Sequence, residues 1–286
     1  MRFRARVAAR APKRPVGEGR AAGAAMALAA AILVSSCTPA ATPRTSAFGS
    51  ARAPEPWRIA ARIARRDQEL ASFRGQARLD YQGSKQRFKS SQVVVVQAPQ
   101  SIRIDVMNPF GVSYTVATDG ARLAAFDRRE KVFYEGSAHA SNFHRFTGVP
   151  LGAPELAALI RGLPPQLGAA KGGTVVKVSD GWEWTRQLPG GATLDMVVDF
   201  DHLEPLRLRM RGAPGSQDVE AAFGDYRDVT GVRVPFWIYV TFADGSALTL
   251  TYKSVQREVA LAGDAFVLDR PPKARVVNID SESAGG

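Results

Sequence analysis

The sequence predicts a mainly β protein of the α+β class, in which a curved antiparallel sheet of about a dozen strands wraps around about three helices. Two observations predict this fold. Apolar residues recur with a period of two over most of the chain beyond residue 72, and turn signals such as Asp119-Gly120 and Asp244-Gly245 separate these segments. Helices do not alternate with the strands, so consecutive strands should pair as hairpins. A sheet of that size must curl or close to hide its edges.

Residues 1–36 predict a lipoprotein signal peptide. Residues 1–20 carry seven basic side chains and one acidic one, and residues 21–34 carry no charge, a stretch too short for a permanent membrane span. Val34 then lies three positions before Cys37, with Ser35 and Ser36 directly before it, as in bacterial lipoprotein cleavage sites. We therefore expect lipid attachment at Cys37. The alternative is an ordinary signal peptide with an incidental cysteine.

Composition and charge exclude several classes of protein. Cys37 is the only cysteine, so neither an intramolecular disulfide nor a zinc cluster of thiolates can form. The chain has 38 basic and 27 acidic residues, of which the signal segment holds seven and one, so 31 and 26 remain after cleavage, a net charge of +5. This excess suits anionic lipid head groups, although an Arg-rich composition accounts for it more simply. It is far below what nucleic-acid binding requires.

A flexible tether and a helix are expected to follow the signal segment. Residues 37–56 hold the lipidated cysteine and a stretch rich in Pro, Ala, Ser and Thr, which has little to bury. The spacing of Ile59, Ile63 and Leu70, with charges between them, predicts an amphipathic helix over 57–71. The folded domain is expected over 57–270, and residues 271–286 are expected to form a polar, disordered tail.

The first set of strands begins where the apolar period changes from 3.6 to two. Every second residue from Phe73 to Tyr81 is apolar or small, which predicts a strand with one wet face. Further strands are expected over residues 86–98, 101–107, 112–118, 122–126 and 132–135.

Two helices are expected to interrupt the sheet, one near residues 138–146 and one that opens at Ala153. Pro154 and Glu155 lie in the first turn of the second helix, and Gly162 and the prolines after it stop the helix. Its apolar residues fall at positions i, i+3, i+4 and i+7, namely Leu156, Leu159, Ile160 and Leu163.

The rest of the chain returns to strands, expected over 174–179, 182–188, 192–200, 205–211, 218–227, 233–243 and 246–255. Two segments, Val93 to Val96 and Phe236 to Phe242, are apolar on both faces and predict a sheet that is covered on both sides. With about three helices available, a strongly curved sheet around an apolar interior is the economical arrangement. Periodicity does not decide whether that interior is packed or hollow.

The common catalytic and metal-binding motifs do not occur. His139, His144 and His202 lack the spacing of metal ligands and are expected at the surface or at helix caps. The run Lys171-Gly172-Gly173-Thr174 lacks the order of a phosphate-binding loop and predicts a turn, and there is no Gly-x-Ser-x-Gly motif for a nucleophilic serine. The sequence therefore predicts a protein that is not an enzyme and needs no cofactor or metal.

One loop stands out because turn tips are normally polar, whereas this one carries apolar residues. Met107, Pro109 and Phe110 lie beside Asn108 between two predicted strands. In one interpretation Phe110 folds back onto the core. In the other it protrudes and contacts a bilayer or a partner.

The order of these motifs resembles the family of outer-membrane lipoprotein receptors called LolB, within the LolA/LolB-like lipoprotein carrier superfamily and its relatives such as DUF4292-type lipoproteins. The resemblance runs from Trp57 to Leu268 and rests on the Asn108-Pro109-Phe110-Gly111 loop, on Phe146 to Leu151 before a Leu-rich helix, and on Phe223-Gly224-Asp225-Tyr226 before Val234-Pro235. It is a match of motif order rather than of extended identity. The loop has Phe where an aliphatic residue is common in the family.

The resemblance implies an unclosed β-barrel of about 11–13 strands, whose helices line or cap an apolar cavity that takes acyl chains. Leu156, Leu159, Ile160 and Leu163 would then belong to the cavity or its lid, and the loop of Met107, Pro109 and Phe110 would contact a membrane or partner. The implied cargo is an acylated lipoprotein or lipid, received from a periplasmic LolA-like carrier without covalent chemistry. Thr38 is not the Asp that marks retention in the inner membrane of some bacteria, which favours the periplasmic face of the outer membrane. We expect a monomer.

Two other functions remain open from the sequence. The same fold could bind a free lipid or glycolipid, or the chain could be a structural outer-membrane lipoprotein that binds a protein partner through a sheet edge or the Phe110 loop. A packed interior would favour the structural role, and a cavity would favour the two lipid-binding functions.

Overall fold

The computed structural model describes residues 52–83, 86–165, 172–212 and 218–282. Cys37 and the expected signal segment lie outside the described residues. The elements, in chain order, are α1 (Pro56–Glu69), β1 (Ser72–Gln82), β2 (Arg87–Gln97), β3 (Ser101–Asn108), β4 (Gly111–Thr118), β5 (Arg122–Asp127), β6 (Val132–Ser137), α2 (Ala140–Thr147), α3 (Ala153–Leu159), β7 (Thr174–Lys177), β8 (Trp182–Gln187), the 3-10 turn η1 (Pro189–Gly191), β9 (Thr193–Val198), β10 (Pro205–Arg211), β11 (Val219–Val229), β12 (Val232–Phe242), β13 (Ala247–Arg257), β14 (Arg275–Asn278) and α4 (Ile279–Glu282).

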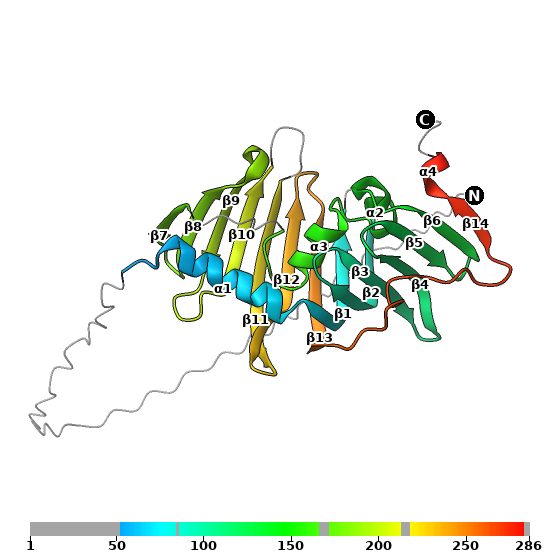
Figure 1. The fold of residues 1–286 in the computed structure, drawn as a ribbon, viewed down its shortest axis with the longest axis horizontal. Helices are drawn as coiled ribbons and strands as arrows, with labels where there is room; N and C mark the ends of the chain where they lie inside the picture. Colours follow the sequence, from blue (N-terminus) through cyan, green and yellow to red (C-terminus); the bar gives the residue numbers. More distant parts are fainter. Residues whose placement is uncertain (1–51, 84–85, 166–171, 213–217, 283–286) are drawn as a thin grey trace, which may run out of the picture. The chain divides into compact units, whose positions relative to one another are not determined.

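The strands of the described residues form one sheet of 14 strands, in the order β14-β6-β5-β4-β3-β2-β1-β13-β12-β11-β10-β9-β8-β7 (Figure 1). Neighbouring strands are antiparallel except for β14, which runs parallel to β6. β1 and β13 pair along their length, from Phe73 opposite Arg257 to Gln82 opposite Ala247. β7 and β14 stand at opposite ends of this order, so the sheet is not closed. The predicted mainly β, unclosed architecture is confirmed.

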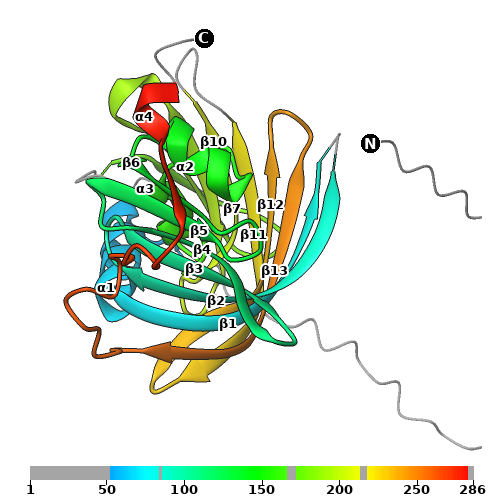
Figure 2. The ribbon, with the colours of Figure 1, turned by 90° about the vertical axis from the view of Figure 1, so that its right-hand side faces the viewer.

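The helices lie on the concave side of the sheet. Figure 2 shows β12, β13, β1 and β2 curving around the side that holds α1, α2 and α3. The helices lie on this side because apolar side chains alternate along the strands. Phe73, Ala77 and Tyr81 of β1, for example, all point to the concave side and are buried. Ile59 and Ile63 of α1 are 0% and 1% exposed, and burial of each aliphatic side chain of this kind contributes roughly 1.5–3 kcal/mol.

A buried ionic cluster joins α1 to the strands beneath it. The side chains of Arg66 and Glu204 are both 0% exposed, and their charged atoms are 3.7 Å apart. The Arg66 guanidinium also lies 5.6 Å from the centre of the Tyr226 ring, and Glu204 accepts hydrogen bonds of 3.1 Å from Arg233. Burial lowers the pKa of Arg66. The cluster fixes where α1 crosses the sheet but leaves the Arg66 nitrogens without hydrogen bonds within the described part of the chain.

The prediction of a disordered tail is wrong for residues 275–282, which form β14 and α4. β14 adds to β6 with Arg275 opposite Val132, so its backbone groups gain sheet partners. The side chain of Ile279 is 0% exposed, and the Asp280 carboxylate accepts hydrogen bonds from the Ser137 amide at 2.9 Å and from Asn142 at 2.9 Å. This added strand raises the count above the expected 11–13.

The strap formed by residues 258–274 explains why some strands are apolar on both faces. It connects β13 to β14, and it contacts the outer face of the sheet where Arg103 donates to the Ala265 carbonyl at 3.4 Å and Arg270 pairs with Glu135. Outward-facing residues of these strands are buried, namely Val95, Ala117 and Phe133, which are 9%, 1% and 2% exposed. The strap therefore covers the outer face of this part of the sheet. The prediction of a second cover is wrong for β12, where Trp237 and Tyr239 on the outer face are 37% and 38% exposed.

Candidate functional site

An apolar cavity of about 300 Å³ lies on the concave side, between the middle of the sheet and the α2–α3 segment. Its strand wall comes from β13, β1, β2, β3 and β4 and is mostly aliphatic, with Leu79, Val94, Ile104, Val116, Leu248 and Leu250. Phe146, Val149, Leu156 and Ile160 face these residues from the helical side. The interior is therefore hollow at this place, which favours the two lipid-binding functions over the structural one.

The helical side of the cavity is held by specific turns. Gly148 caps α2 in the left-handed conformation, with φ of +70°, so the chain reverses directly after Thr147. Pro154 lies in the first turn of α3, where its missing N–H costs nothing. At the end of α3, the Tyr252 hydroxyl of β13 donates to the Ile160 carbonyl at 2.7 Å, and burial raises the pKa of Tyr252. The α2–α3 segment thus covers the cavity as a lid tied to the sheet.

The structure divides the four predicted lid residues into two pairs. Leu156 and Ile160 line the cavity, whereas Leu159 and Leu163, which are 1% and 2% exposed, are buried in the core and do not line it. Helical spacing identified the buried face of α3 correctly. It could not separate side chains that face packed atoms from side chains that face a void.

Four polar residues also line the cavity, and the sequence analysis did not single them out. The Tyr114 hydroxyl of β4 donates to the Phe146 carbonyl at 3.3 Å and so joins the sheet to the lid, whereas Thr147 donates to the Phe143 carbonyl at 2.9 Å within α2. Ser90 and Gln92 bond to each other at 3.1 Å. No carboxylate, ammonium, guanidinium or imidazole group is among the lining residues that the structure describes. The cavity therefore suits an uncharged apolar ligand.

The loop between β3 and β4 presents an aromatic ring to solvent. Phe110 is 98% exposed, so the interpretation in which it folds back onto the core is wrong. The backbone explains its position: the Phe110 amide donates to the Asn108 side-chain oxygen at 2.8 Å, and Gly111 has φ of +119°. Pro109 is also exposed, whereas Met107 is half-buried on β3. This tip is a small apolar surface that side chains of the described chain do not cover.

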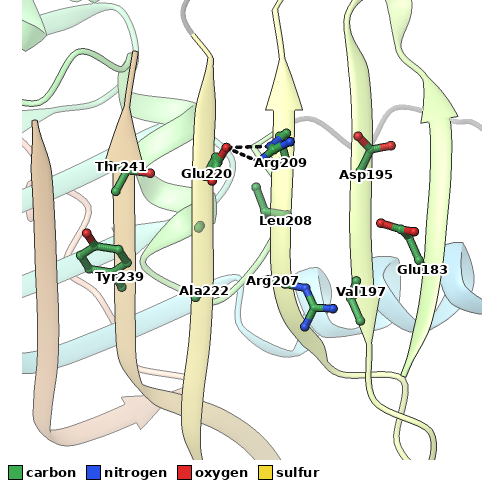
Figure 3. A pocket seen from close by; sticks show the side chains of 11 residues that line it. Glu183, Asp195, Val197, Arg207, Leu208, Arg209, Glu220, Ala222, Tyr239 and Thr241 are labelled. Atoms are coloured by element: carbon green, nitrogen blue, oxygen red, sulfur yellow. Dashed lines mark hydrogen bonds and ion pairs between the residues drawn. The ribbon is translucent and has the colours of Figure 1, made fainter. Parts of the chain in front are cut away.

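Two other hollows are less suited to an apolar ligand. One of about 430 Å³ lies on the face of β8–β12 opposite α1 (Figure 3). Ion pairs lie around it, such as the cross-strand pair of Arg209 with Glu220 at 2.7 Å and the pair of Arg207 with Asp180 in the β7–β8 turn. Another, of about 680 Å³, lies between the strap and strands β5 and β6, and it includes Arg270 and Asp280. Both hollows are lined by charged groups.

The histidines do not form a metal site within the described residues, where no group of three potential ligands occurs. His139 precedes the first residue of α2, and it is exposed, as are His144 and His202. Among the described helices, none is long and apolar enough to cross a membrane.

Solved structures share this fold. A domain described as an outer membrane lipoprotein-sorting protein domain from Vibrio parahaemolyticus aligns with a TM-score of 0.53 and 9% identity, over 74% of this chain and 95% of that chain. A LolA superfamily protein from Nitrosomonas europaea aligns with a TM-score of 0.51 and 13% identity, over 76% and 99%. A DUF1329 family protein from Desulfovibrio piger aligns with a TM-score of 0.51 and 13% identity, over 74% of this chain and 95% of that chain.

These structures place the chain in a class, that of unclosed β-sheets wrapped around helices. Within this class, the chain has the fold of the LolA superfamily protein and of the lipoprotein-sorting protein domain, which is the kind of fold that the order of motifs predicted. At 9–13% identity the likeness concerns the fold alone. No family model matches the sequence, and no curated protein matches it.

Proposed function

We propose that the protein is a lipid-anchored acceptor that takes the acyl chains of a lipoprotein into the cavity beneath the α2–α3 lid and delivers the lipoprotein to the outer membrane. The observation that carries this proposal is the uncharged apolar cavity. Each methylene group that moves from water into such a site contributes roughly 0.8 kcal/mol. Transfer between apolar cavities and a bilayer then needs no covalent step and no nucleotide.

Three further features support the proposal. A domain with the same fold is described as a lipoprotein-sorting domain, which is a property of that protein. Lipid attachment at Cys37, followed by Thr38, would hold the chain on the periplasmic face of the outer membrane. The exposed Phe110 ring would enter that bilayer and bring the cavity to the surface where cargo is released. The cargo would arrive from a periplasmic LolA-like carrier, and the acceptor would act as a monomer.

The test uses residues 37–286 with Cys37→Ser, which cannot carry lipid of its own. This protein is mixed with a LolA-like carrier loaded with a labelled lipoprotein, and liposomes are then added. Val106→Trp fills the cavity, because Val106 lines it from β3. Phe110→Glu places a charge at the loop tip, and Val176→Glu is its control, because Val176 is an apolar residue, 52% exposed, on β7.

We expect the parent protein and Val176→Glu to take the cargo and deliver it. Val106→Trp should take none, while Phe110→Glu should take cargo but fail to deliver it to liposomes. Thermal unfolding establishes that each variant is folded. If the folded parent protein takes no cargo from the carrier, lipoprotein transfer is excluded, and binding of a free lipid becomes the function to test.

A further inference from the structure

Two of the four polar residues that line the cavity, Ser90 and Gln92, lie on β2. The inward-facing residues of this strand are, in order, Phe88, Ser90, Gln92 and Val94. Phe88 is 37% exposed and stacks on Tyr81, whereas Val94 is 2% exposed. The strand therefore runs from the mouth of the cavity to its floor, and the polar pair lies between an aromatic rim and an aliphatic interior.

The pair has unused hydrogen-bonding groups. The Gln92 side-chain amide donates to the Ser90 hydroxyl oxygen at 3.1 Å. Within the described residues, the Ser90 hydroxyl proton has no acceptor and the Gln92 Oε1 atom has no donor. Ser90 and Gln92 are half-buried, so solvent reaches them when the cavity holds no ligand. A ligand that displaces this solvent must supply new hydrogen-bond partners, or the pair loses free energy. A ligand that offers one acceptor and one donor at this height in the cavity would satisfy both.

The chemistry of these groups selects among acyl compounds. A free fatty acid or a phosphate would bring a negative charge to a lining that has no cation among its described residues. An ester offers only acceptors, so it would satisfy the Ser90 hydroxyl and leave Gln92 Oε1 without a donor. A secondary amide offers a carbonyl to Ser90 and an N–H to Gln92.

The geometry points to Ser90 and Gln92 as a subsite for the amide of an N-acyl chain, with the hydrocarbon directed toward Val94 and Leu250. This inference rests on the proposed function, because it assumes that the cavity takes acyl chains. It adds a preference for amide-linked over ester-linked or free acyl chains. It also assigns that preference to two residues, Ser90 and Gln92.

The test measures displacement of the neutral apolar dye N-phenyl-1-naphthylamine from residues 37–286 with Cys37→Ser. Four competitors with a 16-carbon chain are compared: N-methylpalmitamide, methyl palmitate, palmitate and hexadecane. The inference expects the amide to bind about fivefold to tenfold more tightly than the ester, as one added hydrogen bond would give, and palmitate to bind more weakly than the ester.

Gln92→Leu and Ser90→Ala should each reduce the preference for the amide to less than twofold, without weakening the binding of hexadecane. Gln76→Leu is the matched control, because Gln76 faces outward on β1 and is exposed. It should keep the preference.

The outcomes separate the two proposals. If none of the four compounds displaces the dye, acyl binding itself fails and the proposed function with it. If all four bind equally, or if Gln92→Leu keeps the preference for the amide, the subsite is overturned and acyl binding stands.

Discussion

The guanidinium of Arg161, two residues beyond the end of α3, donates a 2.7 Å hydrogen bond to the Asp67 carboxylate on α1. Arg161 is 2% exposed and also donates to the Ala157 carbonyl at 2.8 Å. Burial lowers the pKa of this guanidinium, and the Asp67 carboxylate opposes that effect. The lid of the cavity is thus fastened to α1 by a charged pair of which only the Asp67 side reaches solvent.

Removal of the Asp67 charge should loosen this attachment. Asp67→Asn leaves a buried guanidinium without its counter-ion, and we expect a loss of about 1.5–3 kcal/mol in the free energy of unfolding, the usual value for a hydrogen bond to a charged group. Urea denaturation measures the loss. Asp225→Asn is the control, because the Arg227–Asp225 pair is exposed on both sides and should cost less than about 1 kcal/mol. If the two substitutions reduced the free energy of unfolding equally, Asp67 would contribute no more to stability than an exposed surface charge.

The buried cluster under α1 should respond asymmetrically to substitution. Glu204→Gln leaves Arg66 buried without a counter-ion and should cost about 3–5 kcal/mol. Arg66→Met removes the charge whose nitrogens have no hydrogen bonds in the described structure, while Glu204 keeps Arg233. We expect Arg66→Met to be neutral or stabilising in the same denaturation experiment. A loss as large as that of Glu204→Gln would mean that Arg66 is a net stabilising partner.

The contact between β6 and α4 depends on a glycine. A Cβ atom at Gly136 would lie 2.4 Å from a side-chain carbon of Ile279, so Gly136→Ala must displace Ile279 from its buried position. We expect a cost of about 1–3 kcal/mol, typical of overpacking, together with faster amide exchange in β14 and α4. Gly172→Ala is the control, because a Cβ there meets nothing within 4 Å. Unchanged exchange in Gly136→Ala would show that α4 is not held by this contact.

The attachment of α4 should also depend on pH. A hydrogen bond from the Ser137 side chain, with help from the Ser137 amide, lowers the pKa of Asp280. Because the folded-state pKa is depressed, the carboxylate contributes stability above its unfolded pKa of about 3.9, and this contribution is lost as the pH falls through the lower folded value. The NMR shift of the Ser137 amide should therefore titrate below pH 3.9. The step should vanish in Asp280→Asn, and a midpoint at or above 3.9 would contradict the assignment.

Much of the fold could be predicted because local patterns and tertiary structure agree. The alternation from Phe73 to Tyr81 gave both the strand and its buried face, and the turn at Asp119-Gly120 gave a hairpin between β4 and β5. β14 was missed because its four residues pair with β6, more than 130 positions earlier, and have no alternation of their own. A strand of that kind exists only through its partner.

The site was less predictable for a related reason. Spacing indicated that Leu156 on α3 and Ile160 at its C-cap are buried, but a cavity is defined by the distance to the opposite wall, which no local pattern records. The polar residues Ser90 and Gln92 resemble ordinary strand residues until β1 and β3 place apolar side chains around them. Exposure of Phe110 depends on the Asx turn at Asn108, whose geometry the sequence permits without requiring.

The pairing of β1 with β13 sets the order in which the molecule can assemble. The strands on each side of this junction mostly form hairpins that need only nearby residues, whereas Leu79 pairs with Leu250, which lies 171 positions later in the chain. Contacts of such long range form slowly, because loop closure must precede them. The cavity takes its wall from both sides of the junction, with Leu79 from one and Leu248 from the other. The wall of the cavity is therefore incomplete in any state in which β1 and β13 have not paired, so ligand binding depends on this long-range contact.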